Sequence, residues 1–276
     1  MKKKQLLSNP AAVTGIILLA GSALIFVVNP LLAAAIALFY ILLCVTASFF
    51  PQTNFLLPVI SRGQSGENRV ALTFDDGPAE PTTRQILDLL DKYSVRATFF
   101  VPGMNALRYP EIIKDIVSRG HSIGNHSLSH NPFLMLTSFN NLYREIYDAQ
   151  EILRKMGIYT RAFRPPVGIV NPKLSPILEK LGMFCVTFSC RAFDAGNLHV
   201  KDLASKILEK VKADDIVLLH DVVPRRKEDI TALLPEIERL LTGIIAKGLY
   251  IVPLADLINK EVMSNGQNRQ KKQINH

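Results

Sequence analysis

The segment from residue 70 to residue 78 reads VALTFDDGP. Its first five residues are apolar or β-branched, which predicts a buried β-strand, and Gly77-Pro78 predicts a turn directly after it. Asp75 and Asp76 stand where the strand gives way to the turn. Side chains of neighbouring strand residues point to opposite sides, so a break here would let the two acids take different tasks. A solvated acidic turn is the other interpretation, and this segment alone does not choose between the two.

Short apolar runs alternate with amphipathic runs on the C-terminal side of this segment. Further strands are predicted at 97–101, 184–188, 216–219 and 250–252, and helices at 82–93, 110–118 and 142–156. Strands that alternate with helices indicate parallel pairing and an α/β fold, either open or closed into a barrel. The unusual polar residues fall at strand ends, where α/β folds place their functional sites.

The residues that precede this domain have a different composition. The chain has 276 residues with 32 Lys and Arg and 24 Asp and Glu, yet none of the 57 positions between Lys4 and Arg62 is charged. From Arg62 onward about a quarter of the residues are charged, which is ordinary for a soluble domain. The distribution excludes a disordered chain and a polytopic transporter. It predicts a membrane-embedded N-terminus followed by one globular domain of roughly 200 residues.

Two apolar runs, 11–28 and 31–50, are each long enough to span a membrane, which takes about 20 apolar residues. Asn29-Pro30 separates them as a turn signal. We therefore expect an anchor of two transmembrane helices at 1–61, a linker at 62–68, a globular domain at 69–260 and a disordered basic tail at 261–276. A cleaved signal peptide is less favoured, because the released chain would begin with another long apolar stretch.

Basic residues flank the anchor on both sides, as Lys2 to Lys4 and as Arg62 and Arg69. Flanking basic charge favours the cytoplasmic side, so we expect a two-pass protein of the inner membrane with a cytoplasmic domain. The net charge of +8 forms no Arg or Lys stripe, which argues against nucleic acid and favours an anionic membrane surface or substrate. The three cysteines have no metal-site spacing and are expected to be core thiols.

The segment HSLSH at 126–130 holds two of the six histidines of the chain. Spaced at i and i+4, His126 and His130 are predicted to share one face of a helical turn, which is metal-ligand spacing. Such spacing is common by chance. Two imidazoles and one carboxylate would nevertheless form a catalytic divalent-metal site with a position left for water. Asp76 is the natural third ligand, which leaves Asp75 free to act as a base.

Two further residues are candidates for roles in catalysis. Arg164 precedes Pro165-Pro166, and an always-charged side chain in a stiff loop suits pairing with a carboxylate. A rigid connection with a surface arginine is the alternative. His220 ends the apolar run IVLL, where it could act as a general acid, although this segment alone favours a hydrogen-bonded core histidine.

Taken in order, these segments resemble the polysaccharide deacetylase family, the family 4 carbohydrate esterases with a NodB-homology domain. The resemblance covers 69–257 and implies a distorted (β/α) barrel of about seven strands, here preceded by the transmembrane hairpin. It also implies the hydrolysis of acetyl groups on sugars. By position, the resemblance implies a general base at Asp75, metal ligands at Asp76, His126 and His130, a base-orienting Arg164, an oxyanion-binding amide at Val167, and a general acid His220 paired with Asp194.

The chain also departs from the family pattern. The family usually has Tyr where Val167 stands, and an acid and a Trp where Arg191 and Ala195 stand, and the chain contains no Trp. The loss of aromatic platforms argues against a long glycan in an open groove. With a cytoplasmic domain, it favours a small or polyprenyl-phosphate-linked N-acetylated sugar. The implied cofactor is a divalent metal, most simply Zn²⁺, although Co²⁺, Ni²⁺ or Fe²⁺ would also fit the ligands.

Three functional hypotheses follow. The first is a metal-dependent amidase that acts on an N-acetylated amino sugar, in a glycan or on a lipid. The second is a catalytically silent, membrane-tethered glycan-binding protein. The third is a hydrolase of another small acyl group, such as formyl. Every proposed catalytic position has its expected residue type, which favours the first hypothesis over the second.

Overall fold

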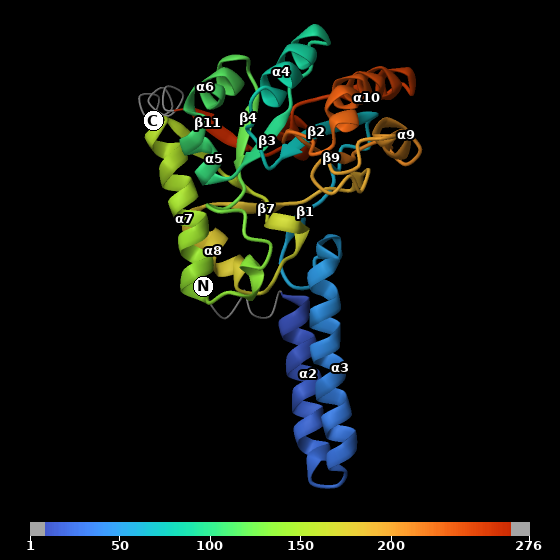
Figure 1. The fold of residues 1–276 in the computed structure, drawn as a ribbon. Coiled ribbons are helices and arrows are strands. Elements are labelled where there is room, and N and C mark those ends of the chain that lie inside the picture. The colour runs from blue at the N-terminus through green and yellow to red at the C-terminus, as the bar shows by residue number, and fades with distance from the viewer. Residues whose placement is uncertain (1–8, 266–276) are drawn as a thin grey trace.

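The computed structural model describes residues 9–265. Lys2 to Lys4 and positions 266–276 of the predicted tail lie outside the described residues. The chain forms a helical hairpin and an α/β body, and the hairpin projects from one side of the body (Figure 1).

The hairpin consists of α2 (Pro10–Phe26) and α3 (Pro30–Phe49), which lie side by side along their length (Figure 1). An asparagine caps each helix: the Asn9 side chain accepts a hydrogen bond from the Ala12 amide, and the Asn29 side chain accepts one from the Leu32 amide. Among the described residues, α3 alone is long and apolar enough to cross a membrane, since α2 has 17 residues. The predicted hairpin is therefore present, whereas its passage through a membrane stays a prediction.

The body is built on a parallel sheet with β2 (Arg69–Asp75) near its middle. This strand pairs with β3 (Thr98–Val101) on one side and with β9 (Ile216–His220) on the other. The order of the sheet is β1-β7-β6-β4-β3-β2-β9-β8, and β10 pairs with β2 off this path. The remaining strands are β1 (Val59–Ile60), β4 (Ser122–Asn125), β6 (Ala162–Phe163), β7 (Phe184–Val186), β8 (Cys190–Arg191) and β10 (Tyr250–Ile251).

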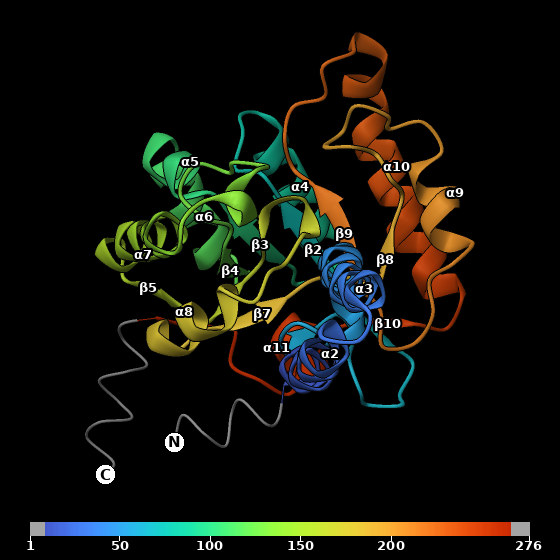
Figure 2. The same cartoon turned by 90° about the horizontal axis from the view of Figure 1, so that it is seen from below.

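Amphipathic helices cover the outer face of this sheet (Figures 1 and 2). Each buries a stripe of apolar side chains, as in α4, where Ile86, Leu87 and Leu90 are fully buried. These helices are α4 (Thr82–Lys92), α5 (Gly103–Arg108), α6 (Pro110–Ser118), α7 (Phe139–Lys155), α8 (Leu174–Leu181), α9 (Leu203–Leu208) and α10 (Lys227–Ala246). In α11 (Leu254–Ile258), Leu254 and Leu257 pack instead with Ala71 and Phe100, on the opposite face of the sheet. Three 3-10 turns lie at Pro51–Thr53, Leu134–Leu136 and Pro166–Gly168.

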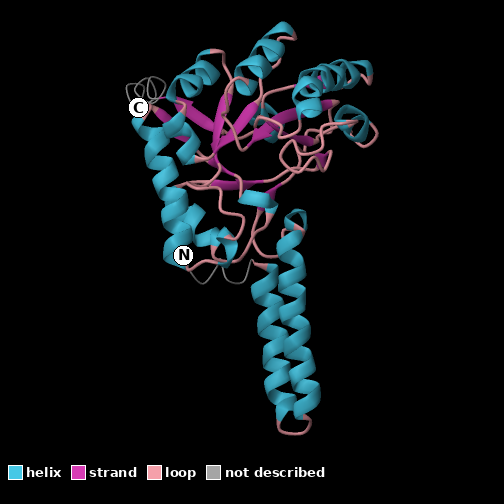
Figure 3. Cartoon of the chain, viewed as in Figure 1, coloured by secondary structure: helices cyan, strands magenta, loops and turns pink. Residues whose placement is uncertain are grey.

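The structure confirms the parallel α/β architecture, and the predicted elements begin and end within three residues of the observed ones. The barrel has eight strands on its path where about seven were expected, and in residues 9–265 no ladder joins β1 to β8. The strands form an incomplete barrel, seen as an arc in Figure 3. The folded body also continues past the predicted end at residue 260, because β11 (Met263–Asn265) pairs with β5 (Ile158–Thr160).

Candidate active site

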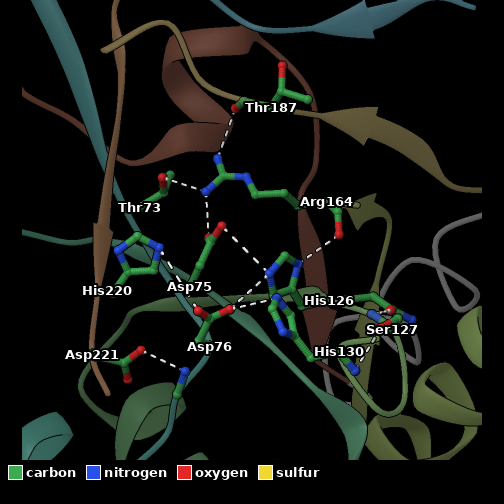
Figure 4. Close-up of polar contacts among 12 residues, drawn as sticks. Thr73, Asp75, Asp76, His126, Ser127, His130, Arg164, Thr187, His220 and Asp221 are labelled. Carbon is green, nitrogen blue, oxygen red and sulfur yellow. Dashed lines mark hydrogen bonds and ion pairs between the residues drawn. The ribbon is translucent and has the colours of Figure 1, made fainter. Parts of the chain in front are cut away.

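The predicted site residues gather at the carboxyl ends of four strands (Figure 4). Asp75 is the last residue of β2 and Asp76 follows it, while His220 is the last residue of β9. His126 follows β4 and Arg164 follows β6. Parallel strands end at a common edge, so residues that are up to 145 positions apart in sequence meet at one place.

Asp76, His126 and His130 form a compact donor cluster whose ligand atoms all lie within 4.8 Å of one another. The Asp76 Oδ1 is 3.3 Å from the His126 Nε2 and 2.9 Å from the His130 Nε2. Burial acts to raise the pKa of Asp76, but hydrogen bonds from both imidazoles outweigh it and hold the pKa well below its usual range. Two imidazoles and an ionised carboxylate match the donor set of a catalytic divalent-metal site.

The His126 ring is fixed in the orientation that a metal ligand needs. Its Nδ1 lies 2.8 Å from the carbonyl oxygen of Arg164, which can only accept, so Nδ1 carries the proton. When the hydrogen bond to Asp76 is replaced by a metal ion, the neutral imidazole would offer the lone pair of Nε2, the ring atom on the side of Asp76. The cluster therefore fits a divalent metal in chemistry and in orientation.

The prediction that the two histidines share a helical face is wrong. Residues 126–130 form a turn in which Ser127 and His130 have φ angles of 66° and 53°. The imidazole rings still converge, with ring centroids 4.7 Å apart. The i, i+4 spacing thus identified the correct residues, but a left-handed turn brings them together in place of a helix.

Glu145 of α7 holds this turn, and no sequence pattern pointed to this role. Its carboxylate accepts hydrogen bonds from the Leu128 amide at 3.1 Å, the Ser129 amide at 3.0 Å and the Ser129 hydroxyl at 2.9 Å. Three hydrogen bonds to one carboxylate stabilise the backbone that carries His130.

Arg164 forms a buried ion pair with the predicted base. Its Nη1 donates to the Asp75 Oδ1 at 2.6 Å and to the Thr73 hydroxyl at 2.8 Å, and its Nη2 donates to the Thr187 carbonyl at 2.9 Å. The residue is completely buried, so the alternative of a surface arginine is wrong. The other carboxylate oxygen of Asp75 lies 3.7 Å from the His126 Nε2 and thus faces the donor cluster (Figure 4).

His220 is paired with Asp194 as the family resemblance implied. The His220 Nδ1 donates to the Asp194 Oδ2 at 2.7 Å, while its Nε2 lies 4.0 Å from the Asp76 Oδ2. Burial acts to lower the pKa of His220, but the hydrogen bond and the charge of Asp194 outweigh it and raise the pKa to about 9. His220 is therefore protonated at neutral pH, as a proton donor must be.

Val167 lies in the 3-10 turn Pro166–Gly168 with a φ of 54°. A β-branched residue in this left-handed region is strained, which indicates that the surrounding loop holds its backbone in place. The side chain is half exposed and faces the pocket described below. The structure thus places the predicted amide donor at the edge of the site.

Asp221 supports the loop that carries the two acids, and sequence reasoning gave it no role. It is fully buried, and its carboxylate accepts hydrogen bonds from the Gly77 amide at 3.0 Å and the Thr83 hydroxyl at 2.7 Å. A Cβ atom at position 77 would overlap the Asp221 carboxylate, so only glycine fits there. The one available signal was an aspartate directly after a strand-terminal histidine.

A cavity of about 360 Å³ unites these groups. Seven of the eight predicted site residues line it, and Arg164 lies buried beneath Asp75. The lining side chains among the predicted residues are Asp75, Asp76, His126, His130, Val167, Asp194 and His220.

Residues 62–186 match the polysaccharide deacetylase family. The chain is 34% identical over 196 residues to a peptidoglycan-N-acetylglucosamine deacetylase of Bacillus cereus, an alignment that covers 70% of this chain and 90% of that protein. This chain belongs to the polysaccharide deacetylase family. Members of this family hydrolyse N-acetyl groups on sugars and generally use a divalent metal.

Two further comparisons cover most of this chain and most of the protein to which it is compared. A chitooligosaccharide deacetylase of Bradyrhizobium is 32% identical to this family member over 202 residues, covering 70% of this chain and 92% of that protein. The crystal structure of a peptidoglycan N-acetylglucosamine deacetylase superposes with a TM-score of 0.67 at 27% identity, covering 74% of this chain and 94% of the other. The fold confirms the family assignment made from the sequence motifs.

Proposed function

We propose that this protein is a membrane-anchored, metal-dependent N-deacetylase that hydrolyses the acetamido group of an amino sugar. The observation that carries the proposal is the convergence of a base, a three-donor metal cluster and a protonated histidine in one cavity. The substrates named for its relatives, peptidoglycan and chitooligosaccharides, support an N-acetylated sugar as the substrate class.

Asp76, His126 and His130 would hold the metal. Their nitrogen and oxygen donors suit Zn²⁺, and Co²⁺, Ni²⁺ or Fe²⁺ are compatible with the same set. A divalent ion bound there supplies Lewis acidity, which acidifies a bound water and polarises the acetyl carbonyl.

The residues of the chain divide the proton transfers between them. Asp75 takes a proton from the attacking water, and its ion pair with Arg164 keeps its second oxygen directed at the cluster. The Val167 amide donates to the oxyanion that forms as water adds to the carbonyl carbon. His220 gives its proton to the departing nitrogen as the C–N bond breaks, which yields acetate and an amino sugar. Asp194 stabilises the imidazolium until that step.

The hairpin is proposed to lie in the membrane. It carries no charged residue, and its large apolar side chains are exposed, as shown by Leu24 at 80% and Leu31 at 83%. Such a surface is unfavourable in water and favourable in hydrocarbon. Flanking basic residues favour a cytoplasmic position for the body.

The direct test is purification of the full chain, followed by elemental analysis and measurement of amine release from a short N-acetylglucosamine oligomer and a polyprenyl-phosphate N-acetylhexosamine. We expect close to one divalent metal per chain and amine release from at least one substrate, with both lost in His126→Ala. His199→Ala is the matched control, since His199 is exposed and lies outside the cavity.

Two results would favour the other hypotheses. A folded, zinc-treated chain that binds no metal and releases no amine would indicate a silent glycan-binding protein. Release from N-formyl but not from N-acetyl sugars would identify a deformylase.

A further inference from the structure

A second cavity, of about 720 Å³, adjoins the catalytic cavity and has no role in the hydrolysis described above. The two cavities share a wall, so a ligand in one can extend into the other. The residues that line both are Val167, Gly168, Phe188, Arg191 and Phe193.

This second cavity lies where the barrel fails to close. Ser61 and Arg62, which follow β1, line one side, and Cys190 and Arg191 of β8 line the other. Phe49 and Phe50, where α3 ends, complete the lining. Figure 2, which looks along the hairpin toward the body, shows α3 in front of this part of the sheet. The gap in the barrel thus connects the catalytic cavity with the base of the hairpin.

The walls of the second cavity are positively charged. Arg62, Arg191, Lys210 and Lys212 line it, and Asp215 is its one acidic lining residue. Asp215 is buried and already neutralised, because it forms an ion pair with Arg62.

Three cations remain for a ligand. Among residues 9–265, Arg191, Lys210 and Lys212 form no ion pair with a carboxylate. Arg191 stacks on the Phe193 ring, with its Cζ 4.1 Å from the centroid, which orders the guanidinium while its N–H groups stay available. Unpaired cations in a concave site favour a phosphate group, which accepts several charge-assisted hydrogen bonds at once.

The end of the cavity near the hairpin is apolar. The side chains of Phe49 and Phe50 are 60% and 51% exposed, and they continue into the apolar surface of α3. A ligand that follows this path has an N-acetylated sugar at the catalytic cluster, a phosphate among the three cations and a hydrocarbon chain beside the hairpin.

We propose that the second cavity binds the phosphate and the first isoprene units of a polyprenyl-phosphate-linked N-acetylated sugar. Arg191, Lys210 and Lys212 contact the phosphate, and Phe49 and Phe50 contact the lipid. This inference rests on the proposed deacetylase function and specifies its substrate class.

The test uses the full chain in nanodiscs of neutral phosphatidylcholine, so that bulk anionic lipid does not compete. The substrates are a polyprenyl-phosphate N-acetylhexosamine and the phosphate-free methyl N-acetylhexosaminide. For Lys210→Glu/Lys212→Glu we expect KM for the lipid-linked sugar to rise at least tenfold, with hydrolysis of the methyl glycoside unchanged within twofold. Lys155→Glu/Lys247→Glu makes the same change of charge on exposed residues outside both cavities and should leave both substrates unaffected.

A third substrate, a uridine-diphosphate N-acetylhexosamine, separates a lipid phosphate from a soluble one. We expect the lipid-linked sugar to have a KM at least tenfold lower than the nucleotide sugar, and Phe50→Ser to reduce that preference. Equal KM values would overturn the lipid assignment, and an unchanged KM in Lys210→Glu/Lys212→Glu would overturn the phosphate site.

Binding of polyprenyl phosphate alone, measured by native mass spectrometry, separates this inference from the proposed function. At least tenfold weaker binding to Lys210→Glu/Lys212→Glu than to wild type supports the phosphate site even in a chain that hydrolyses nothing. Equal binding contradicts the site even in an active deacetylase.

Discussion

Asp75 and His220 each have a buried partner of opposite charge. Arg164 holds Asp75 with an N–O distance of 2.6 Å, and Asp194 holds His220 at 2.7 Å. The first pair directs a carboxylate that can accept a proton, and the second raises the pKa of an imidazole so that it can donate one. The two partners thus set the direction of proton movement across the site.

Replacing Asp194 by Asn should lower kcat at least about tenfold, because the imidazolium of His220 loses the charge that stabilises it. Bound metal and KM should stay close to wild type, since Asp194 belongs to neither the donor cluster nor the predicted phosphate site. Steady-state kinetics with elemental analysis measures both, and Asp148→Asn on the exposed face of α7 is the control. An unchanged kcat would remove His220 from the role of proton donor.

The buried His121 imidazole should make the free energy of unfolding depend on pH. It is 1% exposed, its Nδ1 accepts a hydrogen bond from the Ala97 amide, and burial followed by the charge of Arg96 lowers its pKa to about 4. The His121 imidazole has a pKa near 6.5 in the unfolded chain and about 4 in the folded chain. Its contribution to the free energy of unfolding is therefore complete above pH 6.5 and is lost as the pH falls to 4. The loss should be about 3 kcal/mol.

His121→Asn keeps an acceptor near the Nδ1 position and has no titrating group. Unfolding followed by circular dichroism at pH 7.5 and pH 4.5 should therefore show a smaller loss of stability for the variant than for wild type. Equal losses would mean that His121 does not titrate differently in the two states.

The loops at the strand ends depend on neighbouring elements for their shape. The turn at 126–130 is held by Glu145 of α7, and the loop after Asp76 is held by Asp221, which follows β9. Neither loop has regular hydrogen bonding of its own, so the helix and strand that support it determine where His130 and Asp76 lie.

Glu145→Ala should weaken zinc binding about tenfold, because the turn that positions His130 loses three hydrogen bonds to the carboxylate. Competition with a chelator measures this affinity without any assay of activity. Asp148→Ala, an exposed acid on the same helix, should bind zinc as wild type does. Wild-type affinity in Glu145→Ala would show that the turn keeps its shape without the carboxylate.

The sequence predicted those features that depend on local pattern or on a family motif. The apolar run of β2 and the helical spacing of α7 identified these elements, and the motifs identified the residues that meet at the site. Glu145 and Asp221 were missed because their partners lie 16 to 144 positions away, and no local pattern records such a contact. The left-handed turn at His130 was mistaken for a helix because both conformations suit the same i, i+4 spacing.

In the whole molecule, the base of the hairpin lies beside the catalytic cavity of the body. The end of α3 lines a cavity that adjoins the catalytic cavity, so the hairpin that we propose as a membrane anchor ends close to the reacting groups. With the hairpin in the membrane, as we propose, a membrane-held substrate would reach the site without leaving the bilayer.

The side of the membrane can be tested by labelling a single introduced cysteine. Cys185 and Cys190 are buried, and burial raises the pKa of the two thiols to about 12 and about 11, so they should react slowly. A membrane-impermeant maleimide should label Lys247→Cys only after the cells are opened, because we place the body in the cytoplasm. Labelling in intact cells would place the body on the outer side of the membrane and would favour peptidoglycan as the substrate.

A metal titration of the chelator-treated full chain tests whether Asp76, His126 and His130 form the metal site of a deacetylase. Zinc is added stepwise while bound zinc and amine release from an N-acetylated sugar are measured on the same samples. We expect activity to rise in proportion to bound zinc and to reach its maximum at one equivalent. His130→Ala should show neither zinc binding nor activity at these concentrations. Full amine release by a metal-free chain would contradict the assignment of Asp76, His126 and His130 as the metal site of a deacetylase.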